Sequence, residues 1–350
     1  MSEATGRDVG PPWHRALRGR LDEHVIDSVA LRGNPLGDPS ARPLLVYSPP
    51  GPDVERTALP VIYIIQGYTG QVDMWRNRAP FQPTIIEMID DMFADPTVPR
   101  CRVAMVDCWT SLGGSQYLDS PGTGRYHTYL CDDVVAFVDT VYPTLAHRDH
   151  RAITGKSSGG YGAMVSAMLR PDVFGALATH AGDALFELCY WRDVPEVVRV
   201  LRDNYDGSYA HFFADLRTRP ARSRPGDGVL RNMWAMAAAY SAEADGTVRL
   251  PFDVRTGQVV DEVWHRWLAW DPVRMVPAHS DALHAMRAIY VDAGNRDDFF
   301  LDLGATAFRD ALAAIGVTDV RFELFDGTHG GTGYRYPMAI RYLAERIAAC

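Results

Sequence analysis

One segment, Gly155-Lys156-Ser157-Ser158-Gly159-Gly160, limits what this chain can fold into. It follows the short strand-like run 151–154 and precedes residues 161–169, where Ala, Met and Leu recur at helical spacing. The pattern therefore predicts a strand, a sharp turn and a helix. A G-x-S-x-G sequence in this setting is typical of a nucleophile elbow, whose glycines are needed because strand and helix pass close together. The frame is centred on Ser157, since a frame centred on Ser158 would lack one glycine.

The rest of the chain alternates between strand-like and helix-like segments, which predicts an α/β fold. Two N-terminal strands separated by a turn-rich loop are expected to be antiparallel, and the later strands to form a mainly parallel sheet with helices on both faces. We expect strands at 24–31, 43–47, 59–65, 101–107, 151–154, 176–180, 287–292 and 320–324, and helices at 81–93, 126–142, 161–169, 304–316 and 336–348.

Residues 183–285 interrupt this alternation. They contain helix-like pieces at 194–204 and 232–240 and a cluster of three tryptophans, Trp264, Trp267 and Trp270. We expect a core made of residues 21–182 and 286–350, a flexible N-terminal arm over 1–20, and an insertion over 183–285. The insertion could be purely structural or a cap that lines a pocket with aromatic side chains, and the cap is the interpretation that we favour.

A serine nucleophile needs a base, and the base needs an acid to orient it; on a parallel sheet these groups come from loops at the carboxyl ends of strands. Asp297 lies past a glycine turn after the strand at 287–292 and is the predicted acid, with Asp298 and Asp292 as alternatives. His329, between glycines in the loop after the last strand, is the predicted base. The glycines should let this loop approach the serine closely.

The oxyanion of an ester's tetrahedral intermediate needs two backbone N–H donors. One donor follows the nucleophile and is therefore Ser158. The other should come from the loop after the strand at 59–65, where Tyr68 is the predicted donor and Thr69 would serve if the loop ran one residue differently.

Composition and motifs exclude several other functions. The net charge is −9 and no block of like charges is present, so we expect no nucleic-acid or membrane partner. There is no H-E-x-x-H or other tight cluster of metal ligands and no phosphate-binding loop, so we expect no metal and no cofactor. Lys156 is the single lysine beside 34 arginines, which could reflect codon composition or a role in the elbow.

The cysteines and the N-terminus bear on the location of the protein. Five cysteines without C-x-x-C spacing are typical of reduced thiols. The first twenty residues have no apolar core of the kind found in signal peptides, and no segment approaches the length of a membrane span. We therefore expect a cytoplasmic protein.

From Leu44 onward the chain resembles the Putative esterase family of α/β-hydrolases. This family includes esterase D (S-formylglutathione hydrolase), enterochelin esterases, feruloyl and acetylxylan esterases, and mycolyl transferases. The segments that carry the resemblance are QGYTG, GGSQYLDSP, YHTYLCDDVVAFVD, RAITGKSSGGYGAM, YVDAGNRDDFF and FDGTHGG.

The resemblance implies an α/β-hydrolase fold, a triad of Ser157, Asp297 and His329, and backbone donors at Tyr68 and Ser158, in agreement with the residues chosen above. The 140 residues between Ser157 and Asp297 (297 − 157) are more than compact members need, and the excess coincides with the tryptophan-rich insertion.

These observations together predict a serine hydrolase that cleaves small carboxylic esters or thioesters through an acyl-enzyme. An acyltransferase would use the same residues and is the alternative, and a non-catalytic binding protein with the hydrolase fold is a third interpretation. The insertion could also form a contact between two copies of the chain. The acyl group and the alcohol or thiol are left open.

Overall fold

The computed structural model describes residues 15–219, 221 and 223–348. Its centre is an eight-stranded sheet with the strand order β1-β2-β4-β3-β9-β10-β11-β12. The pairs β1–β2 and β2–β4 are antiparallel and the other five are parallel, which is the mainly parallel arrangement predicted. The strands span Arg20–Asp27, Ala41–Ser48, Val61–Ile65 (β3), Arg102–Val106 (β4), Arg151–Lys156 (β9), Ala176–His180 (β10), Ala288–Gly294 (β11) and Val320–Phe325 (β12).

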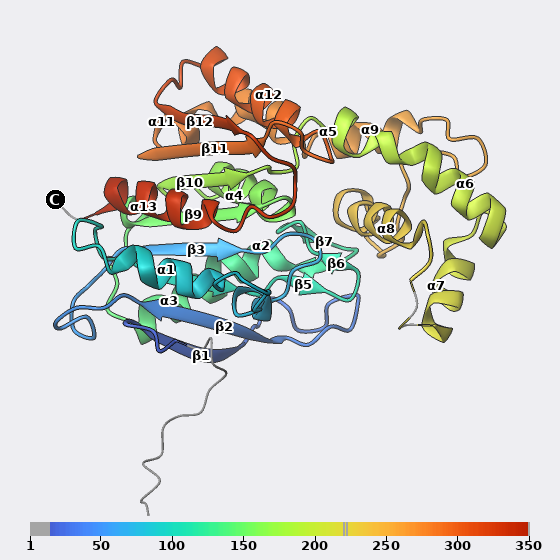
Figure 1. The fold of residues 1–350 in the computed structure, drawn as a ribbon. Helices are drawn as coiled ribbons and strands as arrows, with labels where there is room; N and C mark the ends of the chain where they lie inside the picture. The colour runs from blue at the N-terminus through green and yellow to red at the C-terminus, as the bar shows by residue number, and fades with distance from the viewer. Residues whose placement is uncertain (1–14, 220, 222, 349–350) are drawn as a thin grey trace, which may run out of the picture.

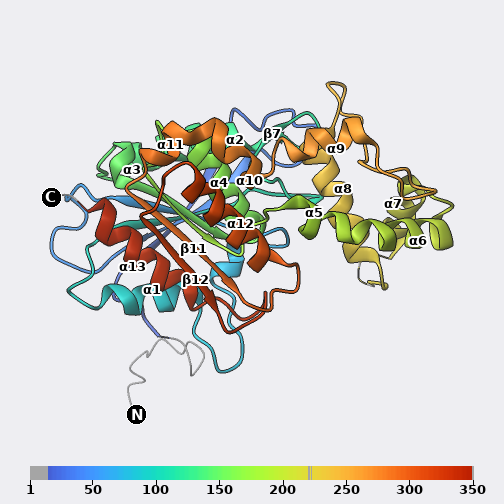
Figure 2. The same ribbon diagram turned by 90° about the horizontal axis from the view of Figure 1, so that it is seen from above.

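The central strands are apolar along their whole length because both faces of the sheet are covered. Along β3, Ile62 and Ile64 enter one core, while Tyr63 and Ile65 enter the other. Helices α1 and α13 cover the first face, and α3, α4, α11 and α12 cover the second (Figures 1 and 2). These helices span Ile85–Phe93, Arg335–Ile347, Val135–Val141, Ser158–Leu169 (α4), Ser280–His284 and Leu301–Ala314 (α12).

A second group of helices extends beyond one end of the sheet (Figure 1). Its apolar side chains, including Val197, Leu230 and Trp267, belong to the same continuous core as Ile65 and Tyr161. The helices of this part and of its connection to β11 are α5 to α10, at Phe186–Cys189, Val194–Tyr205, Tyr209–Thr218, Asp227–Ser241, Asp261–Leu268 and Pro272–Met275.

The predicted elements are present, but the bounds of several differ from the structure. The first strand ends at Asp27, not 31, because Ser28 and Ala30 turn away to donate hydrogen bonds to Asp133. Helix α1 begins at Ile85, not 81, because Thr84 and Glu87 form a capping box. The predicted helix 126–142 is three consecutive helical pieces, with α2 at Tyr126–Thr128, a π-helical turn at Tyr129–Val134, and α3.

Smaller elements complete the chain. The hairpins β5–β6 (Trp109–Thr110, Gly113–Gly114) and β7–β8 (Asp119–Ser120, Gly124–Arg125) lie between β4 and α2. Short 3₁₀ turns are found at Val72–Trp75, Arg148–His150, Trp191–Asp193 and Val276–His279.

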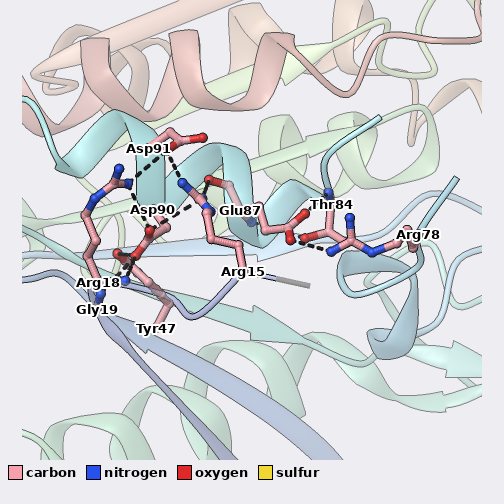
Figure 3. Close-up of polar contacts among 9 residues, drawn as sticks. All are labelled: Arg15, Arg18, Gly19, Tyr47, Arg78, Thr84, Glu87, Asp90 and Asp91. Carbon is pink, nitrogen blue, oxygen red and sulfur yellow. Dashed lines mark hydrogen bonds and ion pairs between the residues drawn. The ribbon is translucent and has the colours of Figure 1, made fainter. Parts of the chain in front are cut away.

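The N-terminal segment crosses helix α1. Residues 1–14 of the predicted flexible arm lie outside the described residues, and residues 15–19 precede β1. Figure 3 shows Arg15 and Arg18 against Asp90 and Asp91 of α1. The Asp90 side chain is fully buried and accepts hydrogen bonds from the Arg18 backbone N–H (2.8 Å) and the Tyr47 hydroxyl (2.9 Å). A buried carboxylate with these donors fixes the start of β1 on α1.

Candidate active site

The turn between β9 and α4 holds Ser157 in a strained conformation. Its φ is 58° and its ψ is −127°, a backbone conformation that residues other than glycine rarely adopt. The Ser157 N–H donates to the His180 carbonyl (3.0 Å), and the Ser157 carbonyl accepts from the Tyr161 N–H (2.9 Å). The surrounding backbone therefore fixes the turn and directs the hydroxyl away from the sheet.

The two glycines of the motif are required by close backbone packing. A Cβ on Gly155 would lie 2.5 Å from the backbone of Gly159, and a Cβ on Gly159 would lie 2.5 Å from the Ile65 carbonyl oxygen. Neither neighbour is a side chain that could move aside. This is the packing expected of a nucleophile elbow.

The loops after β11 and β12 bring Asp297 and His329 together. His329 Nδ1 lies 2.7 Å from Asp297 Oδ2, and the Asp297 side chain is fully buried. The other carboxylate oxygen, Oδ1, accepts the Phe299 N–H (2.8 Å). The Phe299 ring packs edge-on against the imidazole, with 4.8 Å between ring centroids. The imidazole is therefore held at Nδ1 by Asp297 and packed against the Phe299 ring.

The two alternative aspartates have other contacts. Asp298 accepts the backbone N–H of His329 (3.2 Å) and so fixes the loop. Asp292 lies in a buried cluster with His180 (2.7 Å), Arg335 (2.8 Å) and the Tyr290 hydroxyl (3.0 Å). Burial alone would raise the pKa of Asp292, but His180 and Arg335 hold it below its ordinary value.

The glycines beside His329 do not act as the sequence analysis expected. A Cβ added to Gly330 would meet nothing within 4 Å, so this glycine is not needed for a close approach to the serine. Gly331 instead adopts a positive φ of 67°, which is a turn requirement.

Ser157 and His329 line the same cavity, of about 740 Å³. The predicted oxyanion donors Tyr68 and Ser158 line it as well, as does Thr69. The loop that carries Tyr68 passes directly over the elbow, since a Cβ on the preceding Gly67 would lie 3.1 Å from the Lys156 carbonyl and 3.5 Å from Ser157 Cβ. Four of the five predicted site residues therefore line one cavity, and the fifth, Asp297, contacts His329 (2.7 Å) without being among the described residues that line it.

The wall of the cavity opposite the sheet comes from the predicted insertion. Tyr190, Arg192, Val229 and Asn232 line it. Trp264, Trp267 and Trp270 are not among the described residues that line the cavity. Trp267 is fully buried, and its indole N–H donates to Ser241 (2.8 Å), so this tryptophan packs the interior of the segment.

The hydroxyl of Ser157 contacts a residue that the sequence analysis did not select. Its Oγ lies 3.5 Å from Oδ1 of Asp183, a long contact, whereas no hydrogen bond joins it to His329 in this structure. Catalytic hydrogen bonds are often long or unformed without a substrate. Asp183 follows β10 at its carboxyl end, where the topological rule that selected Asp297 and His329 also applies. By sequence, Asp183 was the first residue of the predicted insertion.

Lys156 also lines the cavity. Burial lowers the pKa of Lys156 below its ordinary value, and Asp297 and Asp298 oppose this change. The ammonium group therefore interacts electrostatically with the two aspartates that follow β11.

No group of three or more His, Cys, Asp or Glu side chains in the described part of the chain could hold a metal ion. Among the helices within the described ranges, none is long and apolar enough to cross a membrane.

Comparison with known proteins identifies the family. The sequence profile of the family described as "Putative esterase" matches residues 39–336, which is most of the chain. The structure is similar to a ferulic acid esterase, with a TM-score of 0.60 and 16% identity over 95% of this chain and 100% of the other.

Two further solved structures share the fold. One is an S-formylglutathione hydrolase from Agrobacterium tumefaciens, with a TM-score of 0.56 and 16% identity over 96% and 98% of the two chains. The other is the fluorophosphonate-binding serine hydrolase FphF from Staphylococcus aureus, with a TM-score of 0.57 and 14% identity over 93% and 98%. The predicted α/β-hydrolase fold is confirmed.

Proposed function

This chain belongs to the Putative esterase family and is a carboxylic ester hydrolase, and we propose that it works through an acyl-enzyme formed on Ser157. The observation that carries this proposal is the strained Ser157 in one cavity with His329, whose Nδ1 lies 2.7 Å from Asp297. In the proposed reaction, His329 takes the proton of the Ser157 hydroxyl as its oxygen attacks the ester carbonyl. Attack requires that this hydroxyl leave Asp183 and hydrogen-bond to His329.

The remaining residues have supporting roles in the proposed reaction. The backbone N–H groups of Tyr68 and Ser158 stabilise the oxyanion, and Asp297 orients the imidazole and stabilises its charge. The alcohol or thiol leaves with the proton from His329, and water then attacks the acyl-enzyme with the same imidazole as base. Residues 183–285 act as a cap, since Tyr190, Val229 and Asn232 line the cavity.

The test is hydrolysis of p-nitrophenyl esters from acetate to decanoate by the wild type and by Ser157→Ala, with intact-mass detection of an acyl adduct. We expect turnover that falls by at least about 10⁴-fold in the variant, because the nucleophile is removed. A fluorophosphonate probe should label the wild type at Ser157. Undiminished turnover in Ser157→Ala would refute the proposed nucleophile.

The same experiment separates hydrolysis from acyl transfer. A stable adduct on Ser157 that clears only when an alcohol is added would replace the hydrolase mechanism by acyl transfer. Parallel assays with acyl thioesters decide whether thiols are accepted as leaving groups.

A further inference from the structure

The carboxylate of Asp183 is placed against the reacting atoms. Asp183 lies three residues after β10, is buried, and lines the same cavity as Ser157 and His329. Its Oδ1 is 3.5 Å from Ser157 Oγ. Any acyl group bound to Ser157 must therefore pass close to this oxygen.

The two carboxylate oxygens of Asp183 are used unequally. Oδ2 accepts three hydrogen bonds, from the Tyr190 hydroxyl (2.7 Å), the Ser158 hydroxyl (3.0 Å) and Gln116 Nε2 (3.2 Å). Among the described residues, the contact of Oδ1 is the long one to the nucleophile. An ionised carboxylate oxygen can accept about two hydrogen bonds, so Oδ1 keeps acceptor capacity directed at the reaction centre.

A network of buried side chains holds Asp183 in place. Gln116 Nε2 also donates to the Tyr240 hydroxyl (2.9 Å), and the Tyr190 and Tyr240 hydroxyls lie 3.3 Å apart. The rings of Tyr190 and Tyr240 pack against Phe186. The carboxylate is therefore fixed from both the β6–β7 loop and the helical segment, and its orientation does not depend on a bound substrate.

A carboxylate at this position is unfavourable for a neutral acyl group. Burial raises the pKa of Asp183, while the donors from Tyr190, Ser158 and Gln116 stabilise its charged form. The charged form repels the negative oxygen that develops at the ester carbonyl during attack. A positive charge on the acyl group would offset this repulsion and pair with Oδ1.

The cavity is also lined by the cations Arg192 and Lys156 and by the carboxylates of Asp193 and Glu196, but among the described lining residues Asp183 is the carboxylate that contacts the Ser157 hydroxyl. Arg192 is paired with Asp193 (3.2 Å) and donates to the Asp298 carbonyl (2.5 Å). Lys156 interacts electrostatically with Asp297 and Asp298. Neither cation contacts Asp183 in the structure.

We propose that Asp183 Oδ1 binds an ammonium group on the acyl part of the substrate, so that the preferred substrates are esters of α-amino acids. This inference rests on the proposed function. In an acyl-enzyme, an α-ammonium nitrogen is separated from Ser157 Oγ by three bonds, which places it at a distance comparable to that between Oγ and Oδ1. The ammonium group and the buried Asp183 carboxylate then form a charge-assisted hydrogen bond.

The test compares three benzyl esters that differ in one substituent: alanyl with an α-ammonium group, lactyl with a hydroxyl, and isobutyryl with a methyl group. Assays near neutral pH keep much of the amine charged. We expect wild-type kcat/KM to be roughly 10- to 100-fold higher for the alanyl ester than for the isobutyryl ester, the range for a hydrogen bond between charged groups. Asp183→Asn should remove this preference, which is measured as the ratio of kcat/KM for the alanyl ester to that for the isobutyryl ester within the same variant.

A matched control is Asp302→Asn. Asp302 lies in the first turn of α12 within the field of Asp297 and is not among the described residues that line the cavity. Its loss removes one negative charge near the site and should leave the alanyl-to-isobutyryl ratio unchanged. An equal fall in that ratio in both variants would mean that general charge, not contact with Asp183, sets the preference, and the inference would be wrong.

The wild-type measurements keep the inference testable if Asp183→Asn does not fold. If wild-type enzyme hydrolyses the isobutyryl ester as well as or better than the alanyl ester, the inference about Asp183 is wrong, but the proposed ester hydrolysis still stands. If only the lactyl ester is preferred, Asp183 binds a hydroxyl group on the substrate and not an ammonium group, and the inference is again wrong. Inhibition by 1-aminoethylboronic acid and isopropylboronic acid measures the same preference without turnover, and the amino compound should bind more tightly. If no ester is hydrolysed and fluorophosphonate does not label Ser157, the proposed function fails and the inference fails with it.

Discussion

Three aspartates near His329 differ in what their oxygens contact. Asp297 contacts imidazole Nδ1, Asp298 contacts the backbone N–H of the same histidine, and Asp292 is bound to Arg335 and His180. A carboxylate can orient an imidazole and stabilise its positive charge only through a ring nitrogen. Of these three residues, Asp297 has that contact, so the geometry favours it over the two alternatives.

The acid can be identified by conservative substitution. Asp297→Asn should lower kcat by about 10⁴-fold, because the amide keeps the shape of the side chain but favours the wrong imidazole tautomer. Asp298→Asn is the matched control and should lower kcat by less than about 10-fold, since it contacts only the backbone of His329. The measurement is the pH profile of kcat for both variants. A larger loss in Asp298→Asn would reverse the assignment.

Asp183 gives a prediction about stability. Because its pKa is raised in the folded state, the buried carboxyl favours folding below its ordinary pKa near 4, and this contribution is lost as the pH rises through the raised value. The free energy of unfolding of Asp183→Asn relative to wild type should therefore increase from about pH 4 upward. Urea titrations at a series of pH values measure it, and a decrease over that range would contradict the prediction. A buried charge that lowers stability at neutral pH is typical of a functional residue.

At the scale of elements, the elbow depends on contacts between the backbones of β9, α4 and the end of β3. Gly155→Ala or Gly159→Ala should lower the free energy of unfolding by at least about 3 kcal/mol, because each new Cβ would meet backbone atoms at 2.5 Å. Gly330→Ala, whose Cβ would meet nothing within 4 Å, should change it by less than about 1 kcal/mol. Thermal denaturation of the three variants checks both statements. Wild-type stability in Gly159→Ala would show that β3 can move away from α4.

At the scale of the whole molecule, the helical segment and the sheet share one core. The Ser120 hydroxyl donates to the Ala238 carbonyl of α8 (2.6 Å), and Gln116 Nε2 donates to the hydroxyl of Tyr240 on the same helix (2.9 Å). Apolar side chains of both parts form a single continuous cluster. The segment is therefore expected to unfold together with the sheet.

Cooperative unfolding can be measured directly. Five of the eight tryptophans lie in residues 186–270, so fluorescence reports mainly on the helical segment, whereas far-UV circular dichroism reports on the whole chain. The two urea transitions should coincide, because the segment has no separate core. Fluorescence that changes at clearly lower urea would show that the segment unfolds as an independent unit.

The sequence alone determined the elements that have strong local signals. The buried runs of β3 and β10, the elbow around Ser157, and the order of serine, aspartate and histidine along the chain all follow from short-range patterns. These patterns are reliable because backbone geometry and the period of burial act within a few residues. The sequence could also limit the acid to three neighbouring aspartates, but it could not choose among them by contact.

Only the tertiary structure decided the parts of the site that depend on residues far apart in the chain. Gln116 and Tyr190 donate hydrogen bonds to Oδ2 of Asp183 and leave Oδ1 able to accept another. The hydroxyl of Tyr240 on α8 contacts both of these side chains and holds them in position. Which aspartate contacts His329 is likewise set by how two loops pack across the sheet edge. Such contacts join side chains whose separation in the sequence carries no periodic signal, so folding of the whole chain is needed to bring them together.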